Sequence, residues 1–210
     1  LESLRLAVSR GEVHFVLTNP GHYVVLEATH GATRIATLQA RYAGEVYTRF
    51  GAAILVRSNR PELTNLQDLT GKSLMAVSPN AFGGFQMGWR ELAAVDINPF
   101  VDMRLLQFAG FPQDAIIEAV LNGEVDAGFV RSGILERMIT EGKVGANKLK
   151  VLNRQQVEGF VPALSTRLYP EWPFAKVKHT PEVLAKQVAQ ALLAMPGNDP
   201  AARAARAAGW

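Results

Sequence analysis

Hydrophobic positions at the start of the chain change from a helical spacing to a short continuous run. Leu1, Leu4 and Val8 recur every three or four residues, which is typical of one face of a helix, and Gly11 follows as a stop signal. Residues 15–17 are uniformly apolar, as in a buried strand. The pattern therefore predicts a helix, a tight turn and a strand.

A similar pattern returns in the second half of the chain. A Gly-Glu-Val turn, an apolar run and a further glycine occupy residues 11–21 and again residues 123–133. We interpret this echo as two similar lobes. The alternative is that unrelated α/β units share the same turn pattern.

Aligning the two echoes brings four residues into correspondence. Asn19 falls opposite Arg131, and Pro20 falls opposite Ser132. All four follow the carboxyl end of an expected buried strand. Ligands bind at that end in open α/β sheets, so these positions are candidates for a binding site.

The spacing of apolar residues predicts further elements along the chain. Strands are expected at residues 34–39, 47–57, 74–77, 104–108, 148–152 and 161–166; helical segments at 65–69, 85–93, 112–121 and 180–195, with one more that starts at Arg131–Ser132; and a turn at 169–173. Alternation of strands and helices favours parallel sheets. The expected fold class is α/β, with two lobes that are each a mostly parallel sheet flanked by helices.

Two expected strands are natural crossings between the lobes, at residues 47–57 and 161–166. Two crossings make one lobe discontinuous. We therefore expect a first lobe from residues 1–52 and 166–210, and a second lobe from residues 53–165.

Composition excludes several classes of protein. The 210 residues are 48% hydrophobic, enough for a sizeable core. The net charge is only +3 and no long run of like charge occurs, so we expect no nucleic-acid partner. The chain has no cysteine, which excludes disulfides, thiolate zinc sites and a cysteine nucleophile. It lacks a signal peptide or an apolar run of about 20 residues.

Catalytic signatures are scarce. The chain has no Gly-x-Ser-x-Gly elbow and no His-Glu-x-x-His motif. Gly71-Lys72-Ser73 looks like the end of a phosphate loop, but Leu66 stands where that motif begins with glycine, and a strand follows where a helix is needed. We expect no catalysis and no cofactor in this chain.

The histidines do not predict a metal site. His14, His22 and His30 are spaced by eight residues, and His179 lies far along the chain. His14 is expected in a strand, whereas His22 and His30 bracket a helix, so their rings should not converge. Surface or hydrogen-bonded histidines are the preferred interpretation.

A glycine-containing loop joins the strand at 74–77 to the following helix. Glycine lets the backbone approach a ligand closely, and the first N–H groups of a helix lack intrahelical partners and suit a small anion. Asn80 can cap the helix or donate a hydrogen bond. The candidate ligand-binding residues here are Asn80, Ala81, Phe82, Gly83 and Gly84. The alternative is a packing turn with Phe82 in the core.

Other candidates come from the second echo and the first crossing strand. Arg131 supplies a planar fork that matches carboxylate, phosphate or sulfur oxyanions, and Ser132 adds a hydroxyl. Tyr47 and Arg49 can line the same site from the crossing strand. For each arginine the alternative is a solvated charge or a salt bridge between lobes.

Three stretches resemble the periplasmic phosphonate-binding proteins of ABC transporters. They are Asp68-Leu-Thr-Gly-Lys72, Ala76-Val-Ser-Pro-Asn80 and Val120-Leu-Asn-Gly-Glu-Val-Asp-Ala127. The resemblance implies a type 2 periplasmic binding-protein fold, in which two α/β lobes are joined by two crossing strands and clamp a ligand in the cleft between them.

Further stretches are similar to a branch of this family that is fused to sensor histidine kinases, of which tetrathionate sensors are the best known. They are Ala81-Phe-Gly-Gly84, Phe129-Val-Arg-Ser-Gly-Ile-Leu-Glu136 and Leu168-Tyr-Pro-Glu-Trp-Pro-Phe-Ala175. This resemblance implies a periplasmic or extracytoplasmic domain, with transmembrane and kinase segments in the parent chain.

The chain departs from the phosphonate binders in its ligand residues. Those proteins usually hold the phosphonate with a Ser-Thr-Ser-Gly loop, where this chain has Ala81-Phe-Gly-Gly84. The acidic residues that read an aminoalkyl tail have no match at Phe111, Pro112 or Arg131. The departures argue against phosphonate and leave another anion as the expected ligand.

The chain also begins and ends inside the family pattern. Family members carry a strand, a helix and a strand before the helix at Leu1, and they continue past Trp210, so we expect a truncated fragment. The missing strands would leave unpaired backbone groups on the first lobe's sheet. We therefore expect a homodimer or an exchange of elements.

The expected function is a sensory domain that binds a small oxyanion and signals to a histidine kinase. Closure of the cleft around the ligand would carry the signal, because a ligand stabilises the state that it binds more tightly. The alternative is a free solute-binding protein that delivers a phosphonate-like or sulfur-containing anion to a transporter. An enzyme on the same fold is a further rival, but no nucleophile and base pair is evident.

Overall fold

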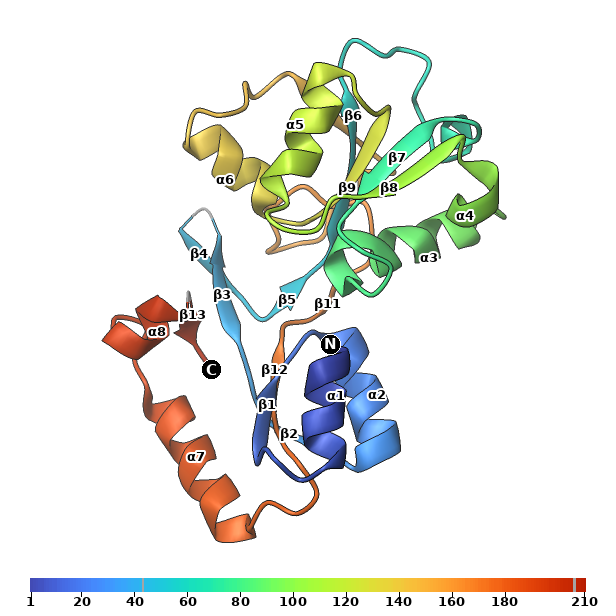
Figure 1. The fold of residues 1–210 in the computed structure, drawn as a ribbon. Helices are drawn as coiled ribbons and strands as arrows, with labels where there is room; N and C mark the ends of the chain where they lie inside the picture. Colours follow the sequence, from blue (N-terminus) through green and yellow to red (C-terminus); the bar gives the residue numbers. More distant parts are fainter. Residues whose placement is uncertain (43, 206) are drawn as a thin grey trace. The chain divides into compact units, whose positions relative to one another are not determined.

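The computed structural model describes residues 1–42, 44–205 and 207–210, and it divides the chain into two compact units (Figure 1). Unit 1 contains Leu1–Arg49 and Tyr169–Trp210, and unit 2 contains Phe50–Leu168. The chain thus enters unit 2 once and returns to unit 1. The lobe boundaries expected from the sequence, after residues 52 and 165, stay a prediction.

Unit 1 contains two small antiparallel sheets and four helices within the described residues. Its elements are α1 (Glu2–Ser9), β1 (Phe15–Leu17), α2 (Pro20–His30), β2 (Thr33–Thr37), β3 (Gln39–Tyr42), β4 (Glu45–Tyr47), β11 (Tyr169–Pro170), β12 (Pro173–Lys176), α7 (Glu182–Ala194), α8 (Pro200–Ala204) and β13 (Ala207–Gly209). The sheet orders are β1-β12-β2 and β13-β3-β4. The two-residue strand β5 (Arg49–Phe50) pairs with β11 where the chain passes between units. No helix in the described part of the chain has the length and apolar character to cross a membrane.

Local signals explain the helix that follows β1. The side chain of Asn19 accepts a hydrogen bond from the backbone N–H of His22 at 2.9 Å, which satisfies one of the unpaired donors of α2. Pro20 occupies the first helical position, where its missing N–H costs little. Gly31 ends the helix with a left-handed φ of +65°. The helix then packs its buried Leu26 into a core that includes Val16.

Unit 2 is built around one five-stranded sheet. Its elements are β6 (Ala52–Arg57), the 3₁₀ helix η1 (Gln67–Leu69), β7 (Ser73–Ala76), the π-helix η2 (Phe82–Gln86), α3 (Met87–Ala93), α4 (Pro99–Asp102), β8 (Leu105–Phe108), α5 (Asp114–Asn122), β9 (Ala127–Arg131), α6 (Ile134–Thr140) and β10 (Leu149–Leu152). The strand order is β10-β6-β9-β7-β8. Strand β7 runs parallel to both β8 and β9, whereas β6 runs antiparallel to both β9 and β10.

The α/β composition matches the prediction, but the sheets are not two mostly parallel ones. All pairings in the sheets of unit 1 are antiparallel, and in unit 2 only the pairings of β7 are parallel. The cause is an inserted strand. Strand β12 lies between β1 and β2, and β6 lies between β9 and β10, each against the direction of its neighbours. The sequence pattern of strand, helix and strand gives no sign of such an insertion.

The sequence echo has a structural counterpart. In unit 1 the order is α1, β1, α2, β2, and in unit 2 it is α5, β9, α6, β10. Both Gly-Glu-Val turns begin with a glycine in the left-handed region, Gly11 at φ +71° and Gly123 at φ +80°. Gly11 follows Arg10, the cap residue of α1, whereas Gly123 is itself the cap residue of α5, and in both echoes the strand begins four residues after the glycine.

The predicted strand at residues 161–166 is wrong, because hydroxyl groups replace part of the backbone pairing there. The hydroxyl of Ser165 accepts from the N–H of Ile54 at 2.8 Å and donates to the carbonyl of Leu152 at 2.7 Å. The hydroxyl of Thr166 accepts from the N–H of Ala52 at 3.1 Å. Both side chains are fully buried. The segment is therefore held against β6 without forming a strand.

Other predictions also need correction. The long strand expected at residues 47–57 is divided among β4, β5 and β6, and the turn expected at 169–173 contains β11 and the start of β12. Helix α7 begins at Glu182 and not at the expected residue 180, and the hydroxyl of Thr180 donates to the carbonyl of His14 at 2.6 Å. The elements β3, α4, α8 and β13 were not predicted.

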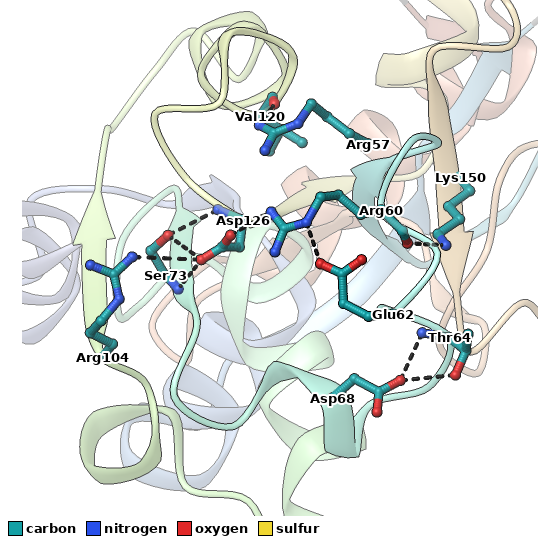
Figure 2. A network of polar contacts seen from close by, with 10 residues as sticks. All are labelled: Arg57, Arg60, Glu62, Thr64, Asp68, Ser73, Arg104, Val120, Asp126 and Lys150. Carbon is teal, nitrogen blue, oxygen red and sulfur yellow. Dashed lines mark hydrogen bonds and ion pairs between the residues drawn. The ribbon is translucent and has the colours of Figure 1, made fainter.

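A partly buried carboxylate joins the amino ends of β7 and β9 (Figure 2). One oxygen of Asp126 accepts from the backbone N–H and the hydroxyl of Ser73, at 2.9 and 2.8 Å. The other oxygen accepts from Nη1 of Arg60 at 2.7 Å. The N–H of Asp126 donates back to the Ser73 hydroxyl at 2.9 Å. These bonds tie two neighbouring parallel strands and the loop after β6 at one point.

The charge of Asp126 is favoured by these contacts. Burial by itself would raise the pKa of Asp126, but the hydrogen bonds from Ser73 and Arg60 outweigh it and hold the pKa far below the usual range of an aspartate. The side chain is only 15% exposed, so solvent screens the contacts little. The ionised form should therefore stabilise the folded unit.

We expect Asp126→Asn to lower the free energy of unfolding by about 2–3 kcal/mol at neutral pH, because an amide loses the charge-assisted bonds. Urea denaturation measures this change. The matched control is Glu124→Gln, an exposed acidic residue two positions earlier, which should change the free energy by less than about 0.5 kcal/mol. Equal effects of the two substitutions would contradict the assigned role of Asp126.

The contribution of Asp126 should also depend on pH. An aspartate in an unfolded chain has a pKa of about 4, which is above the lowered pKa of Asp126 in the folded protein. The stabilisation is therefore complete above about pH 4 and is lost as the pH falls toward the folded pKa. The difference in urea midpoint between the wild type and Asp126→Asn should shrink below about pH 4. A difference in urea midpoint that stays constant below about pH 4 would contradict ionisation of Asp126 as the source of the stabilisation.

Candidate functional site

Two strand ends in unit 2 place candidate residues at one edge of the sheet. Strands β7 and β9 are parallel neighbours, with Leu74 opposite Ala127 and Met75 opposite Gly128. Their carboxyl ends therefore meet at the same edge. The glycine-containing loop follows β7, and Arg131 ends β9.

The loop leads into an unusually wide first helical turn. The N–H of Gln86 donates to the carbonyl of Ala81, five residues earlier, at 3.0 Å. The N–H groups of Gly83, Gly84 and Phe85 precede this first intrahelical bond. A π-turn thus lengthens the stretch of donors at the start of the helix. Ala81 is the capping residue and provides no side-chain bond, so Asn80, which is exposed, does not cap the helix as predicted.

The two glycines of the loop are required by packing. A Cβ atom on Gly83 would lie 2.8 Å from Cε2 of Phe50, and one on Gly84 would lie 2.3 Å from Cγ2 of Val77. Neither glycine has a positive φ, so turn geometry is not the reason for them. Phe85 is the ring that enters the core, and Phe82 stays partly exposed with its ring edge toward Phe50, 6.3 Å between centroids.

Arg131 lies beside this loop. Its guanidinium carbon is 4.2 Å from the centroid of the Phe50 ring, a cation–π distance. Its backbone N–H donates to Oε1 of Gln113 at 2.8 Å. A Cβ atom on Gly83 would be 3.6 Å from Cβ of Arg131. The structure therefore brings the predicted loop and the predicted cation together, with Phe50 beneath both.

Ser132 has a role in the backbone of unit 2. Its hydroxyl accepts from the N–H of Gly51 at 3.1 Å, and its own N–H donates to the carbonyl of Gly51 at 2.9 Å. The residue is only 1% exposed. This reciprocal pair fixes the end of β9 to the segment before β6, and a contact of the Ser132 hydroxyl with a ligand stays a prediction.

The remaining candidates lie in unit 1. Asn19 caps α2 through its side-chain oxygen. Tyr47 is 7% exposed and stacks on Tyr42 with 5.9 Å between ring centroids. Arg49 is exposed in β5. The structure gives Asn19 a structural role and places Tyr47 in a packed position, and a contact of any of the three with a ligand stays a prediction.

Two residues of the site were missed by the sequence analysis. Phe50 lies between Arg49 and Gly51 in the first crossing segment. A bulky apolar residue next to a glycine in that segment could have indicated a packed residue at the site. Gln113 precedes α5 and gave no signal, because its contact with the end of β9 depends on how two distant segments pack.

The histidines make separate local contacts. Nδ1 of His22 is 3.0 Å from the hydroxyl of Thr18, and burial lowers the pKa of His22. The rings of His14 and His179 meet edge to face with 5.0 Å between centroids. Among residues 1–42, 44–205 and 207–210, no three histidine or acidic side chains converge to hold a metal ion.

The sequence matches one protein family over almost its whole length. The family is described as "ABC transporter, phosphonate, periplasmic substrate-binding protein", and the match covers residues 2–210. A curated relative, the tetrathionate sensor histidine kinase TtrS of Salmonella typhimurium, is 31% identical over 197 residues, which is 93% of this chain and 33% of the relative. The chain therefore spans about a third of the length of that relative.

Solved structures support the same fold. XAC2383 from Xanthomonas citri, bound to ATP, matches with a TM-score of 0.73 and 17% identity, over 97% of this chain and 71% of that one. A binding protein component of an ABC phosphonate transporter from Pseudomonas aeruginosa matches with a TM-score of 0.68 and 13% identity, over 97% of this chain and 65% of that one. At these identities the likeness concerns the fold alone, which is the α/β fold of periplasmic binding proteins.

Gly84→Ala should destabilise unit 2 by about 1–3 kcal/mol, because the new methyl group overlaps the side chain of Val77. Thermal or urea unfolding measures the loss. The second variant is Val77→Ala, which opens space at that point. We expect Gly84→Ala to cost clearly less in the Val77→Ala background. Additive effects would show that the overlap with Cγ2 of Val77, the atom that Val77→Ala removes, is not the reason for this glycine.

Proposed function

We propose that this chain, which belongs to the family of periplasmic substrate-binding proteins of phosphonate ABC transporters, is the ligand-sensing domain of a histidine kinase. The support is the relationship to TtrS, a sensor kinase that is similar over 93% of this chain. The transmembrane and kinase segments would belong to a longer parent protein. The family is periplasmic, and we propose the same extracytoplasmic location for this domain.

The proposed ligand is a small oxyanion, and the observation that carries this proposal is the position of Arg131. Its guanidinium is 4.2 Å from the Phe50 ring, and its Cβ lies next to Gly83. A guanidinium on an aromatic face keeps a defined plane and can bind an oxyanion through paired hydrogen bonds. The early N–H groups of η2 lie at the same sheet edge and favour negative charge.

The loop chemistry supports an anion other than a phosphonate. Residues 81–84 carry no hydroxyl, so these four residues can donate to a ligand only through their backbone N–H groups. Ser132, the hydroxyl predicted nearby, is buried against Gly51. We propose a sulfur or carboxylate oxyanion that is held by Arg131 and backbone donors. Asn19, Tyr47 and Arg49 of unit 1 stay predicted ligand contacts.

The second candidate function is a free solute-binding protein of an ABC transporter. The family description and the Pseudomonas aeruginosa structure favour it, because both concern transporter components. The gene that encodes this chain distinguishes the two functions. An in-frame kinase region supports the sensor, and a complete reading frame without one, next to permease genes, supports the transporter component.

A thermal-shift screen of thionates, sulfonates, carboxylates and phosphonates tests the ligand class. A ligand at about 100 times its dissociation constant should stabilise the protein by about 2.7 kcal/mol, which is a readily measured rise in melting temperature. We expect an effective compound among the thionates, sulfonates or carboxylates. Stabilisation by phosphonates alone would contradict the proposed class.

Arg131→Ala should abolish most of the shift produced by the most effective compound, because the charged fork is lost. Arg131→Lys should restore only part of it. The matched control is Arg154→Ala, which removes an exposed arginine of the same unit and should leave the shift unchanged. If Arg131→Ala keeps the full shift, the proposed anion contact is misplaced.

A further inference from the structure

Strand β8 forms one open edge of the sheet in unit 2. It is the last strand in the order β10-β6-β9-β7-β8, and Figure 1 shows it beyond β7, near α3 and α4. The N–H of Arg104 donates to Lys72 and the N–H of Ala109 donates to Ala76, both on the β7 side. Because successive residues of a strand point their backbone groups in opposite directions, those of Gln107 point toward β7 like the N–H of Ala109, and those of Leu106 and Phe108 point away from β7.

An aromatic patch lies beside this edge. We define it as Trp89 of α3, Phe100 of α4 and Phe108 of β8, which surround the fully buried ring of Phe85. The Trp89 and Phe100 rings are 5.1 Å apart, the Phe100 and Phe108 rings 6.5 Å, and each lies within 5.6 Å of Phe85. Trp89 and Phe108 are 37% exposed and Phe100 is 50% exposed. Three touching rings that all reach the surface mark an interaction site.

Two aliphatic residues extend the exposed apolar surface. Val101 is 74% exposed and follows Phe100 in α4, and Leu105 is 41% exposed at the start of β8. With about 200 Å² for each aromatic residue and somewhat less for the aliphatic ones, the five residues expose about 400 Å². A stable interface buries about 800 Å² from each partner, so this surface and the strand edge together supply a substantial part of one.

The edge carries no charge that would prevent pairing. Residues 105–113 contain no acidic or basic side chain. Natural proteins commonly protect exposed strand edges with lysine or proline, and β8 has neither within Leu105–Phe108. Arg104 is charged and exposed, but it lies before the strand. An uncharged edge next to an aromatic surface suits an equally uncharged partner.

We propose that this edge is a homodimer interface, in which β8 pairs antiparallel with β8 of a second copy of the chain and the two aromatic patches meet. A second copy fits because it offers the same uncharged strand edge and the same aromatic patch. One two-fold axis therefore brings strand edge against strand edge and patch against patch. The N–H and carbonyl groups of Leu106 on one copy become hydrogen-bonded to those of Phe108 on the other, which places Gln107 of the two copies opposite each other at the axis. This interface lies in unit 2 and differs from the sheet edge of the first lobe that the sequence analysis considered.

A cysteine introduced near the axis tests the pairing, because the natural chain has no cysteine. Antiparallel pairing around Leu105–Phe108 brings position 107 of the two copies within disulfide reach. Gln107→Cys should therefore form a covalent dimer under mild oxidation. The control is Val183→Cys on α7, at a site that is 70% exposed, which should stay mostly uncrosslinked. Equal crosslinking of both variants, or none at position 107, would overturn the proposal.

Analytical ultracentrifugation of the cysteine-free protein provides a second test. The wild type should associate to a dimer, and Val101→Glu should weaken the association by at least about tenfold, because it places a buried charge in the interface. Val183→Glu replaces an equally exposed valine and should leave association unchanged. Near-UV circular dichroism shows that both variants are folded. A monomeric wild type, or a dimer that tolerates Val101→Glu, would contradict the inferred interface.

Discussion

The structure of unit 2 depends on the burial of strand β6 between strands that run against it. Residues 52–56 are at most 1% exposed. Their side chains alternate between two cores: Ala53 and Leu55 face the core that includes Ile116 of α5, and Ile54 and Val56 face the core that includes Phe85 and Phe129. A central strand with two apolar faces holds both layers of helices to one sheet.

The same strand positions the candidate site. Its beginning is fixed by hydroxyl groups, because Ser132 bonds to Gly51 and Thr166 bonds to Ala52. Phe50, two residues before β6, lies under the Arg131 guanidinium and against Gly83. The orientation of the cation therefore follows from the burial of a neighbouring apolar strand. An arginine with the same sequence neighbours but without this strand would lack the aromatic surface that orients it.

The sequence predicts best what depends on neighbouring residues. Helix α7, strand β7 and the paired turns at Gly11 and Gly123 follow from spacing and from glycine at helix ends. The inserted strands β6 and β12 and the irregular segment around Ser165 could not be predicted, because their partners are distant in the sequence. At the site, the loop and Arg131 were recognisable from residue type, whereas Gln113 and the reason for Gly83 and Gly84 required tertiary contacts.

One continuous segment connects the two surfaces inferred for unit 2. Residues 82–93 begin as the π-turn beside Arg131 and continue into α3, which carries Trp89 of the aromatic patch. Phe85 lies between them in sequence and contacts the rings of Trp89, Phe100 and Phe108 from the core. A ligand that shifts the first turn must also move Phe85, because close-packed rings cannot absorb a displacement separately. Linkage is reciprocal, so any such shift would change ligand affinity and self-association by the same factor.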